Sequence, residues 1–447
     1  MRPSLAADPG LSFGDPYALG LLFLGVVLCA GIAALSHEHE RAFSASIIYL
    51  GLGVAASAGI HLLDGRRIDP IADAALVERI AEVALVVAVF TAGLKIERRL
   101  GWREWRSVVL LLAVALPATI ALIAVFGVHV MGLSLGAAIV LGAALGATDP
   151  VLAGDIGIGA PGEQPDEPQE ARFAVSAEAG LNDGLAFPFL LLGFVVLGGA
   201  GASTYVEWAL ADVLYAVPVG GLIGGLGGYG LAALVVPLRH RELLDDRFDG
   251  FVALAAPLLL YGAAEALGAY GFLAGFAGGL AFRRYEFGHE YNRRVHDGAE
   301  TVEKFLELAV ILVLGSMVTV AALDEPGLAG WLLAPVLLLA IRPAVVLVLF
   351  ARQPVTTGRE RRFIAWFGVR GVAALYYVTY AVEAGFLSPG EESTVVWTAV
   401  VCVFLSILVH GITGAPLSRR VDEEAPRQAQ QRPRRPAGSQ SPYRGTG

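Results

Sequence analysis

The chain is poor in cysteine, in lysine and in charge of either sign. Only two cysteines, Cys29 and Cys402, occur in 447 residues, so we expect no disulfide framework, and no metal-ligand spacing is present. Two of the 32 basic residues are lysines, and the net charge of −9 does not indicate nucleic-acid binding. Charged residues make up 16% of the chain, whereas 56% of it is hydrophobic. This composition is typical of a membrane protein rather than a soluble one.

Apolar runs long enough to cross a bilayer recur along almost the whole chain. They predict an all-α polytopic membrane protein with about 13 transmembrane helices. The predicted spans lie at about 17–35, 43–63, 78–94, 107–128, 134–159, 173–199, 208–236, 251–267, 269–282, 304–323, 331–351, 363–385 and 394–416.

The distribution of basic residues predicts the orientation of these spans. One alternate set of loops, together with the C-terminal tail, holds 26 of the Lys and Arg residues, and the other set holds four. The positive-inside rule therefore places the C-terminus in the cytoplasm and the N-terminus outside, which requires an odd number of spans. Residues 1–417 would form the membrane domain. Residues 418–447 are rich in Pro, Gln, Arg and Ser, and they are expected to be a disordered cytoplasmic tail.

Thirteen spans can be divided into two sets of six separated by one, and the two sets would then be inverted copies. Inverted repeats are common in transporters, whose sites lie near the membrane midplane where helices are broken. Candidate breaks fall in corresponding members of the two sets. Span 5 carries Thr148-Asp149-Pro150, and span 12 carries Gly368-Val369-Arg370-Gly371. The sequence therefore predicts inverted six-helix repeats with two broken crossing helices, spans 5 and 12.

Asp149 is a carboxylate in an apolar span, directly before a proline. Pro150 has no amide hydrogen and disfavours helix in the residue before it, so the turn around Asp149 loses backbone hydrogen bonds. Freed carbonyls, the Thr148 hydroxyl and the Asp149 carboxylate are hard oxygen ligands suited to a small cation. The alternative interpretation is a proline kink with a buried polar cap.

A second group of polar residues lies in span 6. Glu178 and Asn182 are four residues apart and share one helix face, with Asp183 next to them. A carboxylate within the membrane is costly and usually faces a wet cavity, a partner charge or an ion. Asp183 can hold a proton or a cation but not both well. Competition between the two is the simplest mechanism of exchange.

Arg342 and Arg370 are the only Lys or Arg residues in the interior of predicted spans, away from the span ends. Because a buried Arg is almost always paired, we expect Arg342 and Glu178 to form a structural ion pair. Arg370 lies in the suspected break of span 12, where it would offset carbonyl dipoles or carboxylates at the helix crossing. The alternative for Arg370 is that its side chain reaches the cytoplasmic surface, since the basic loop at Arg362 is close in sequence.

Four glycines in span 7, Gly221, Gly224, Gly225 and Gly228, resemble the small-residue motifs that let membrane helices approach closely. They predict a close helix contact. The pattern does not identify the partner helix.

Four motifs taken together resemble the monovalent cation/proton antiporter superfamily, and within it the NhaP-type branch related to animal sodium/proton exchangers. They are Thr-Asp-Pro, Glu-x-x-x-Asn-Asp, Arg-Pro and Gly-Val-Arg-Gly, at positions 148–150, 178–183, 342–343 and 368–371. The resemblance covers all thirteen predicted spans. It implies that the protein is a transporter and not an enzyme. The transporter would exchange Na+ (or Li+ or K+) for H+ across the cytoplasmic membrane by alternating access. It also implies a homodimer, with no cofactor beyond the transported ions.

The resemblance further implies roles for individual residues of the ion site. Asp183 would be the main ion- and proton-binding carboxylate, Asp149 its partner, and Thr148 a further oxygen ligand for Na+. Asn182 would occupy the place of a second Asp found in the electrogenic branch. Its neutral side chain implies an electroneutral exchange of one cation for one proton.

Other positions show both agreement with the family pattern and a departure from it. Glu178 and Arg342 would be the structural ion pair, and Arg370 would lie at the crossing of the broken helices. Many relatives place Ser directly after the Glu, whereas this chain has Ala179. One side-chain ligand of the ion is therefore missing, which leaves the preference among cations open.

Other classes of protein also place two acids in a membrane. An intramembrane aspartyl protease could share a proton between Asp149 and Asp183. Those enzymes resemble a pattern of Tyr-Asp and Gly-x-Gly-Asp that this chain lacks, because its acids follow Ala-Thr and Leu-Asn. A cation channel and a regulatory sensor that binds cations without moving them are the further alternatives.

Overall fold

Helices make up the regular structure of the described chain, and no strand occurs in it. This computed structural model describes residues 16–36, 44–62, 65–150, 170–199, 201–241, 243, 249–287, 293–353 and 356–422. The α-helices are α1 (Pro16–Ser36), α2 (Ala45–Leu62), α3 (Ala74–Leu94), α4 (Arg106–Leu110), α5 (Leu116–Phe126), α6 (Leu135–Gly146), α8 (Glu170–Leu197), α9 (Ala202–Trp208), α10 (Ala216–His240), α11 (Asp249–Ala266), α12 (Gly271–Glu286), α13 (Arg293–Met317), α14 (Gly327–Val336), α15 (Arg342–Phe350), α16 (Gly358–Trp366), α17 (Val372–Ala384) and α18 (Pro389–Asp422). The predicted all-α class is confirmed.

Short π-helical turns join several of these helices into longer rods: η2 (Leu111–Ala115), η3 (Gly127–Met131), η4 (Ala209–Tyr215) and η7 (Leu337–Ile341). A single 3-10 turn, η6 (Ala321–Leu323), precedes α14. Because of these turns, one membrane span can be made of three or four short elements.

Six helical stretches of the described residues are long and apolar enough to cross a membrane, by length and composition: Ala45–Leu62, Arg106–Met131, Glu170–Leu197, Ala202–Arg239, Gly327–Phe350 and Pro389–Gly414. Three shorter apolar helices are Ala18–Ala33, Leu135–Gly146 and Gly250–Ala266. Each of these stretches overlaps a different predicted span. The count of thirteen spans and their arrangement as inverted repeats stay predictions.

Two helices extend beyond the ranges expected from hydropathy. α13 begins at Arg293, whereas the predicted span starts at 304, and α18 continues to Asp422, past the expected domain boundary at 417. The extra turns of α13 carry charged side chains, so an apolar window does not detect them. They are helical all the same, and they are held to α12 by His296 Nε2, which lies 2.9 Å from Glu286 Oε2. Residues 423–447 of the predicted tail lie outside the described part of the chain.

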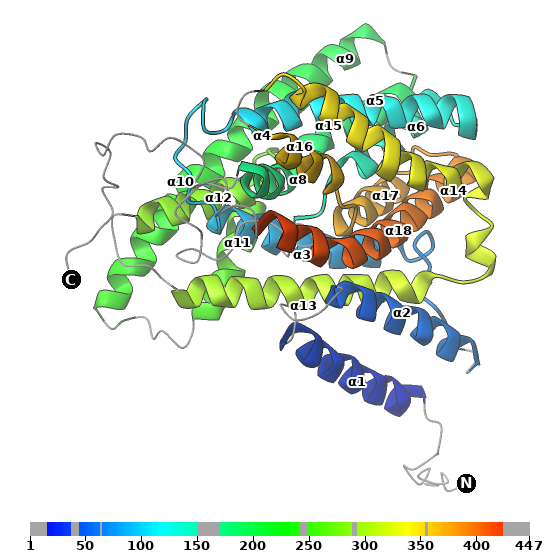
Figure 1. Ribbon diagram of the computed structural model, residues 1–447, viewed down its shortest axis with the longest axis horizontal. Coiled ribbons are helices and arrows are strands. Elements are labelled where there is room, and N and C mark those ends of the chain that lie inside the picture. The colour runs from blue at the N-terminus through cyan, green and yellow to red at the C-terminus, as the bar shows by residue number, and fades with distance from the viewer. Residues whose placement is uncertain are drawn as a thin grey trace, which may run out of the picture.

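The middle of the molecule is built around α8, which contacts α3, α6, α12 and α17 (Figure 1). Most of its side chains between Phe173 and Gly184 are buried. α1 lies at the edge beside α2 and exposes leucines along its length. An apolar side chain that faces outward in this way fits lipid rather than water. The polar residues Glu178, Asn182 and Asp183 of α8 are instead buried inside the bundle.

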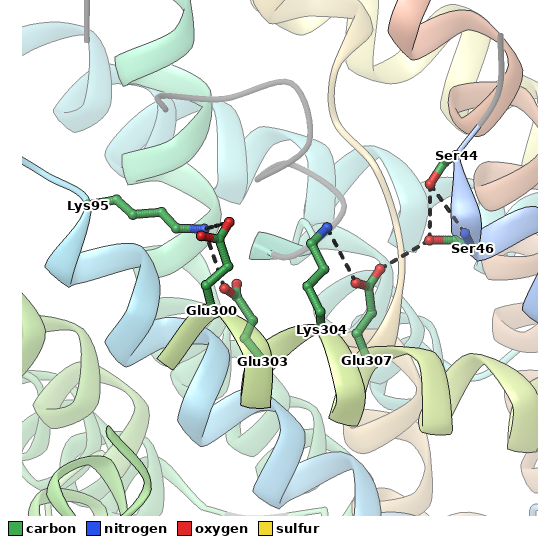
Figure 2. Close-up of polar contacts among 7 residues, drawn as sticks. All are labelled: Ser44, Ser46, Lys95, Glu300, Glu303, Lys304 and Glu307. Atoms are coloured by element: carbon green, nitrogen blue, oxygen red, sulfur yellow. Dashed lines mark hydrogen bonds and ion pairs between the residues drawn. The ribbon is translucent and has the colours of Figure 1, made fainter. Parts of the chain in front are cut away.

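Both lysines of the chain take part in a polar network along α13 that ties this helix to its neighbours (Figure 2). Lys95 Nζ, at the end of α3, is 3.4 Å from both Glu300 Oε1 and Glu303 Oε2. The Glu303 side chain is 1% exposed. Burial lowers the pKa of Lys95, but the two glutamates outweigh it and leave that pKa above its ordinary value. The two carboxylates thus favour the charged form of Lys95.

The second lysine continues this network along the same face of α13. Lys304 Nζ lies 3.9 Å from Glu307 Oε2, and the Ser46 hydroxyl of α2 donates to Glu307 Oε1 at 3.2 Å. Ser44, just before α2, donates its main-chain N–H to the carbonyl of Gly411 in α18. α13 is thus connected through polar contacts to α3 and α2, and α2 in turn to α18.

The glycines of α10 do make the predicted close contact, and the partner is α12. A Cβ atom at Gly224 would collide with the main chain of Ala274, and one at Gly228 would collide with that of Gly278. Gly221 and Gly225 lie on the other face, where a Cβ would meet no atom within 4 Å. Only two of the four glycines therefore serve this contact.

We expect Gly228→Leu to destabilise the protein and Gly225→Leu to be tolerated. The first change forces two backbones apart and should cost about 1–3 kcal/mol of folding free energy, as overpacking does. The second points a leucine at open space. Thermal unfolding of the two purified variants in detergent measures the difference. Equal loss of thermal stability in both would contradict the α10–α12 contact.

Candidate functional site

Two helix breaks face each other at the centre of the bundle. α6 ends at Gly146, and Ala147 then takes an extended conformation with φ −63° and ψ 140°. α16 ends at Trp366, and α17 begins only at Val372. The breaks fall where the sequence predicts them, next to Pro150 and within Gly-Val-Arg-Gly. Each break leaves helix-end carbonyls and amides without intrahelical partners.

Asp149 binds one amide and one carbonyl of the second break. Its carboxylate Oδ2 accepts a hydrogen bond of 2.7 Å from the Val372 N–H, in the first turn of α17. Its own N–H donates to the carbonyl of Val369 at 2.9 Å. A negative group at a helix N-terminus is favoured because the helix dipole is positive there. A Cβ at Gly371 would collide with this carboxylate, so glycine is needed at that position.

Arg370 binds two carbonyls of the first break. Its guanidinium Nη1 donates to the carbonyls of Gly146 and Ala147 at 2.7 and 2.8 Å. The Arg370 side chain is fully buried, so the alternative that it reaches the cytoplasmic surface is wrong. The reason is that the carbonyl end of α6, which carries the negative end of the helix dipole, lies within reach of the guanidinium.

Glu178 and Arg342 lie together beside the crossing. The two guanidinium nitrogens Nη1 and Nη2 donate to the two carboxylate oxygens of Glu178, each at 2.6 Å. Both residues are at most 3% exposed. A bidentate Arg–carboxylate contact of this kind is strong and directional. It connects α8 to α15, and a Cβ at Gly368 would lie 2.7 Å from Arg342 Nε, so the pair also packs against the second break.

Asp183 and Asn182 lie on α8 and are at most 1% exposed. The Asn182 amide Nδ2 donates to the Thr148 hydroxyl oxygen at 2.5 Å, which joins α8 to the first break. Neither carboxylate oxygen of Asp183, nor Oδ1 of Asn182, has a hydrogen-bond partner among the described residues. Asp149 is close enough to Asp183 for the two carboxylates to repel each other. Three buried acceptor oxygens on two consecutive residues of α8 thus have no donor among the described residues.

Among the described residues, the charges around the crossing do not balance. The fully buried charged groups there are three carboxylates, Asp149, Glu178 and Asp183, and two guanidinium groups, Arg342 and Arg370. Burying an uncompensated carboxylate is strongly unfavourable. One proton or one monovalent cation at Asp183 would restore neutrality. The free acceptors are carboxylate and amide oxygens, the ligand type that hard cations take in proteins.

Three further residues, Ser406, His410 and Tyr377, also reach the site. The Ser406 hydroxyl of α18 accepts the Arg370 N–H at 2.8 Å, and His410 binds the carbonyls of Ser406 and Trp366 through its two ring nitrogens. The Tyr377 hydroxyl of α17 donates to the main-chain carbonyl of Asp183. No spacing rule identifies such contacts, because they join helices that are distant in the sequence.

The Glu178–Arg342 pair should show strong coupling in a double-mutant cycle. We expect Glu178→Met or Arg342→Met alone to cost about 3–5 kcal/mol, because each leaves an unpaired buried charge. The double variant, which leaves no charge, should recover much of that loss. Thermal unfolding in detergent of the four proteins measures the coupling. If the two single effects simply add, the pair is not the source of the stability.

Comparison with known proteins places this geometry in a family. A family model described as sodium/hydrogen exchanger, transmembrane, matches residues 14–420. The Na+/H+ antiporter 2 of Zygosaccharomyces rouxii is 28% identical over 369 residues, which cover 78% of this chain and 45% of that protein. The K+/H+ antiporter NhaP2 of Shewanella sp. (strain MR-4) is 27% identical over 250 residues, covering 56% and 42%. This chain thus spans less than half the length of these two relatives.

A solved structure shows the same fold. The sodium proton antiporter MjNhaP1 from Methanocaldococcus jannaschii at pH 8 superimposes with a TM-score of 0.67 over 90% of this chain and 99% of that one, at 17% identity. The family match extends over nearly the whole chain and includes both breaks and the buried acids. The chain belongs to the transmembrane sodium/hydrogen exchanger family.

Proposed function

We propose that this protein is a secondary antiporter that exchanges Na+, or Li+ or K+, for H+ across a membrane. One observation carries the proposal: the buried Asp183 carboxylate, whose two oxygens have no partner among the described residues. Family membership and the antiport activities named for the two relatives support it. Those names include both Na+ and K+, so they leave the transported cation open.

In the proposed mechanism, ion and proton compete for Asp183. When Asp183 is protonated, the charge around the crossing is balanced without a cation. When it is deprotonated, a cation restores the balance, held by Asp183 with oxygens of Asp149 and Thr148. The Asn182 amide donates to Thr148 and so turns that hydroxyl oxygen toward α8. The proton-bound and cation-bound states carry the same net charge, so the protein can undergo alternating access in either state.

The neutral side chain of Asn182 leads to the proposed stoichiometry. With Asp183 as the only titrating carrier group, one cation is exchanged for one proton and no net charge moves. Ala179 lies one turn before Asp183 on the same face of α8 and offers no oxygen. The preference among cations therefore depends on oxygens from the crossing, and exchange measured for each cation across pH would define it.

The remaining assignments belong to the same proposal. The protein would lie in the cell membrane with its N-terminus outside and its C-terminal tail, 418–447, in the cytoplasm. Two copies would form a homodimer. Glu178 and Arg342 would act structurally, Arg370 would hold the helix crossing, and no cofactor would take part beyond the transported ions.

Asp183→Asn should abolish exchange. The variant keeps the size of the side chain but can bind neither a titrating proton nor a cation strongly. Proteoliposomes with an inward Na+ gradient should show a change of internal pH for the wild type and none for the variant. Asp324→Asn, the same change in an exposed loop, serves as the control and should retain full exchange. Retained exchange in Asp183→Asn would refute the role given to this carboxylate.

Imposing a membrane potential should leave the initial exchange rate nearly unchanged, because a one-for-one exchange moves no net charge. Diffusion potentials of either sign across the same vesicles, with Na+ as substrate, test this. They are set with a lipophilic ion, because K+ is itself a candidate substrate. A clear voltage dependence would overturn the one-for-one stoichiometry. Single-channel currents far above the turnover of a carrier would instead identify a channel.

A further inference from the structure

Tyr377 connects the two acids of the site through one helix. It lies on α17, is fully buried, and donates its hydroxyl hydrogen to the main-chain carbonyl of Asp183. Asp149 binds the first turn of the same helix through the Val372 N–H. Val372 and Tyr377 are five residues apart, which corresponds to about 7.5 Å along an α-helix. α17 therefore acts as a rigid spacer between the chain at Asp149 and the chain at Asp183.

The main chain of α8 is opened by a proline just beyond the turn that carries Asp183. Pro188 lies inside α8, four residues after Gly184 and five after Asp183. A proline within a helix has no N–H for the carbonyl four residues before it and clashes with that carbonyl, which opens the helix there. The carbonyl that loses its partner is that of Gly184, so α8 is opened directly after the residue that carries the ion-binding carboxylate. The hydroxyl of Tyr377 binds the carbonyl that immediately precedes this opening.

The ring of Tyr377 has a separate set of contacts. Phe187, one helical turn beyond Asp183, lies 5.9 Å from the Tyr377 ring, 5.2 Å from Tyr380 and 5.4 Å from Tyr270, between ring centroids. Aromatic packing of this kind restricts the position and the tilt of the Tyr377 ring. The hydroxyl is therefore presented to Asp183 by a ring that is already held in place, so ring and hydroxyl can be tested separately.

We propose that Tyr377 is a positioning residue that determines which cation the site prefers, by fixing the distance between Asp183 and Asp149. This inference rests on the proposed function. Loss of the hydroxyl removes the link between the Asp183 main chain and α17, so the turn of α8 next to the proline opening shifts relative to the crossing. Ion preference depends on the size of the oxygen cage, and a shift of the turn changes that size. The aromatic ring by itself does not set it.

Tyr377→Phe tests the proposal because it removes the hydroxyl and keeps the ring. The matched control is Tyr376→Phe, next to it on α17, since the Tyr376 hydroxyl has no hydrogen-bond partner among the described residues. Both variants of the full chain are purified in detergent. Their melting temperatures are measured against rising Li+, Na+ and K+, because a cation that binds the folded state stabilises it. Exchange is then measured in vesicles with the same three cations.

In Tyr377→Phe we expect the half-saturating Na+ concentration to rise about fivefold, the effect of losing one hydrogen bond. We also expect the ratio of the Li+ and K+ values to the Na+ value to change by at least about threefold, with maximal exchange rates within about twofold of wild type. Tyr376→Phe should match the wild type in every cation. A purely structural role would lower melting temperature and maximal rate and leave the ratios unchanged.

Unchanged ratios in Tyr377→Phe overturn the inference, whatever happens to the melting temperature. Altered ratios in both variants also overturn it, because the effect would then not belong to the Asp183 contact. If cations stabilise the wild type and Tyr377→Phe changes their ratios as expected, but the wild type exchanges no cation in vesicles, the proposed antiport fails and the inference stands. A wild type that no cation stabilises overturns both.

Discussion

The structure depends on reciprocal compensation between two broken helices. Buried helix ends are unfavourable unless their amides and carbonyls find partners. Here each break supplies the partner for the other. Asp149, from the first break, binds the N-terminus of α17, and Arg370, from the second, binds the C-terminal carbonyls of α6. The two helix ends are thus stabilised by each other at the crossing.

The crossing also explains why an acid can remain buried nearby. Arg342 compensates Glu178 directly, and Arg370 lies against the carbonyl end of α6, so the positive charge in this region is already engaged. Asp183 is left as the group whose charge nothing in the described chain balances. Burial makes the charge of Asp183 unfavourable, and either a bound proton or a bound cation removes that unfavourable charge. A carrier needs a group that accepts either ion at similar cost.

Outside the centre, the helices are held by two different kinds of contact. α10 and α12 approach each other through glycines, a packing that works where apolar surroundings offer no hydrophobic gain. α13 is tied to α3 and α2 through charged and polar side chains, including both lysines of the chain. In a chain that otherwise uses Arg, the two compact ammonium groups lie where buried carboxylates crowd one helix face. Nothing in the sequence around the two lysines predicts these contacts.

The sequence by itself determined the class of protein and the residues of the site. Long apolar runs predicted a helical membrane protein, Pro150 and the glycines around Arg370 predicted two breaks, and Glu178 predicted an ion pair with Arg342. These inferences depend on local chemistry, which composition and spacing express. Only the tertiary structure decided the partners: that Asp149 caps α17, that Arg370 binds α6 instead of reaching the surface, and that Tyr377 holds the turn of Asp183. Those contacts join residues about 190 to 220 positions apart. No periodicity relates such distant positions, and their meeting depends on how the broken helices cross.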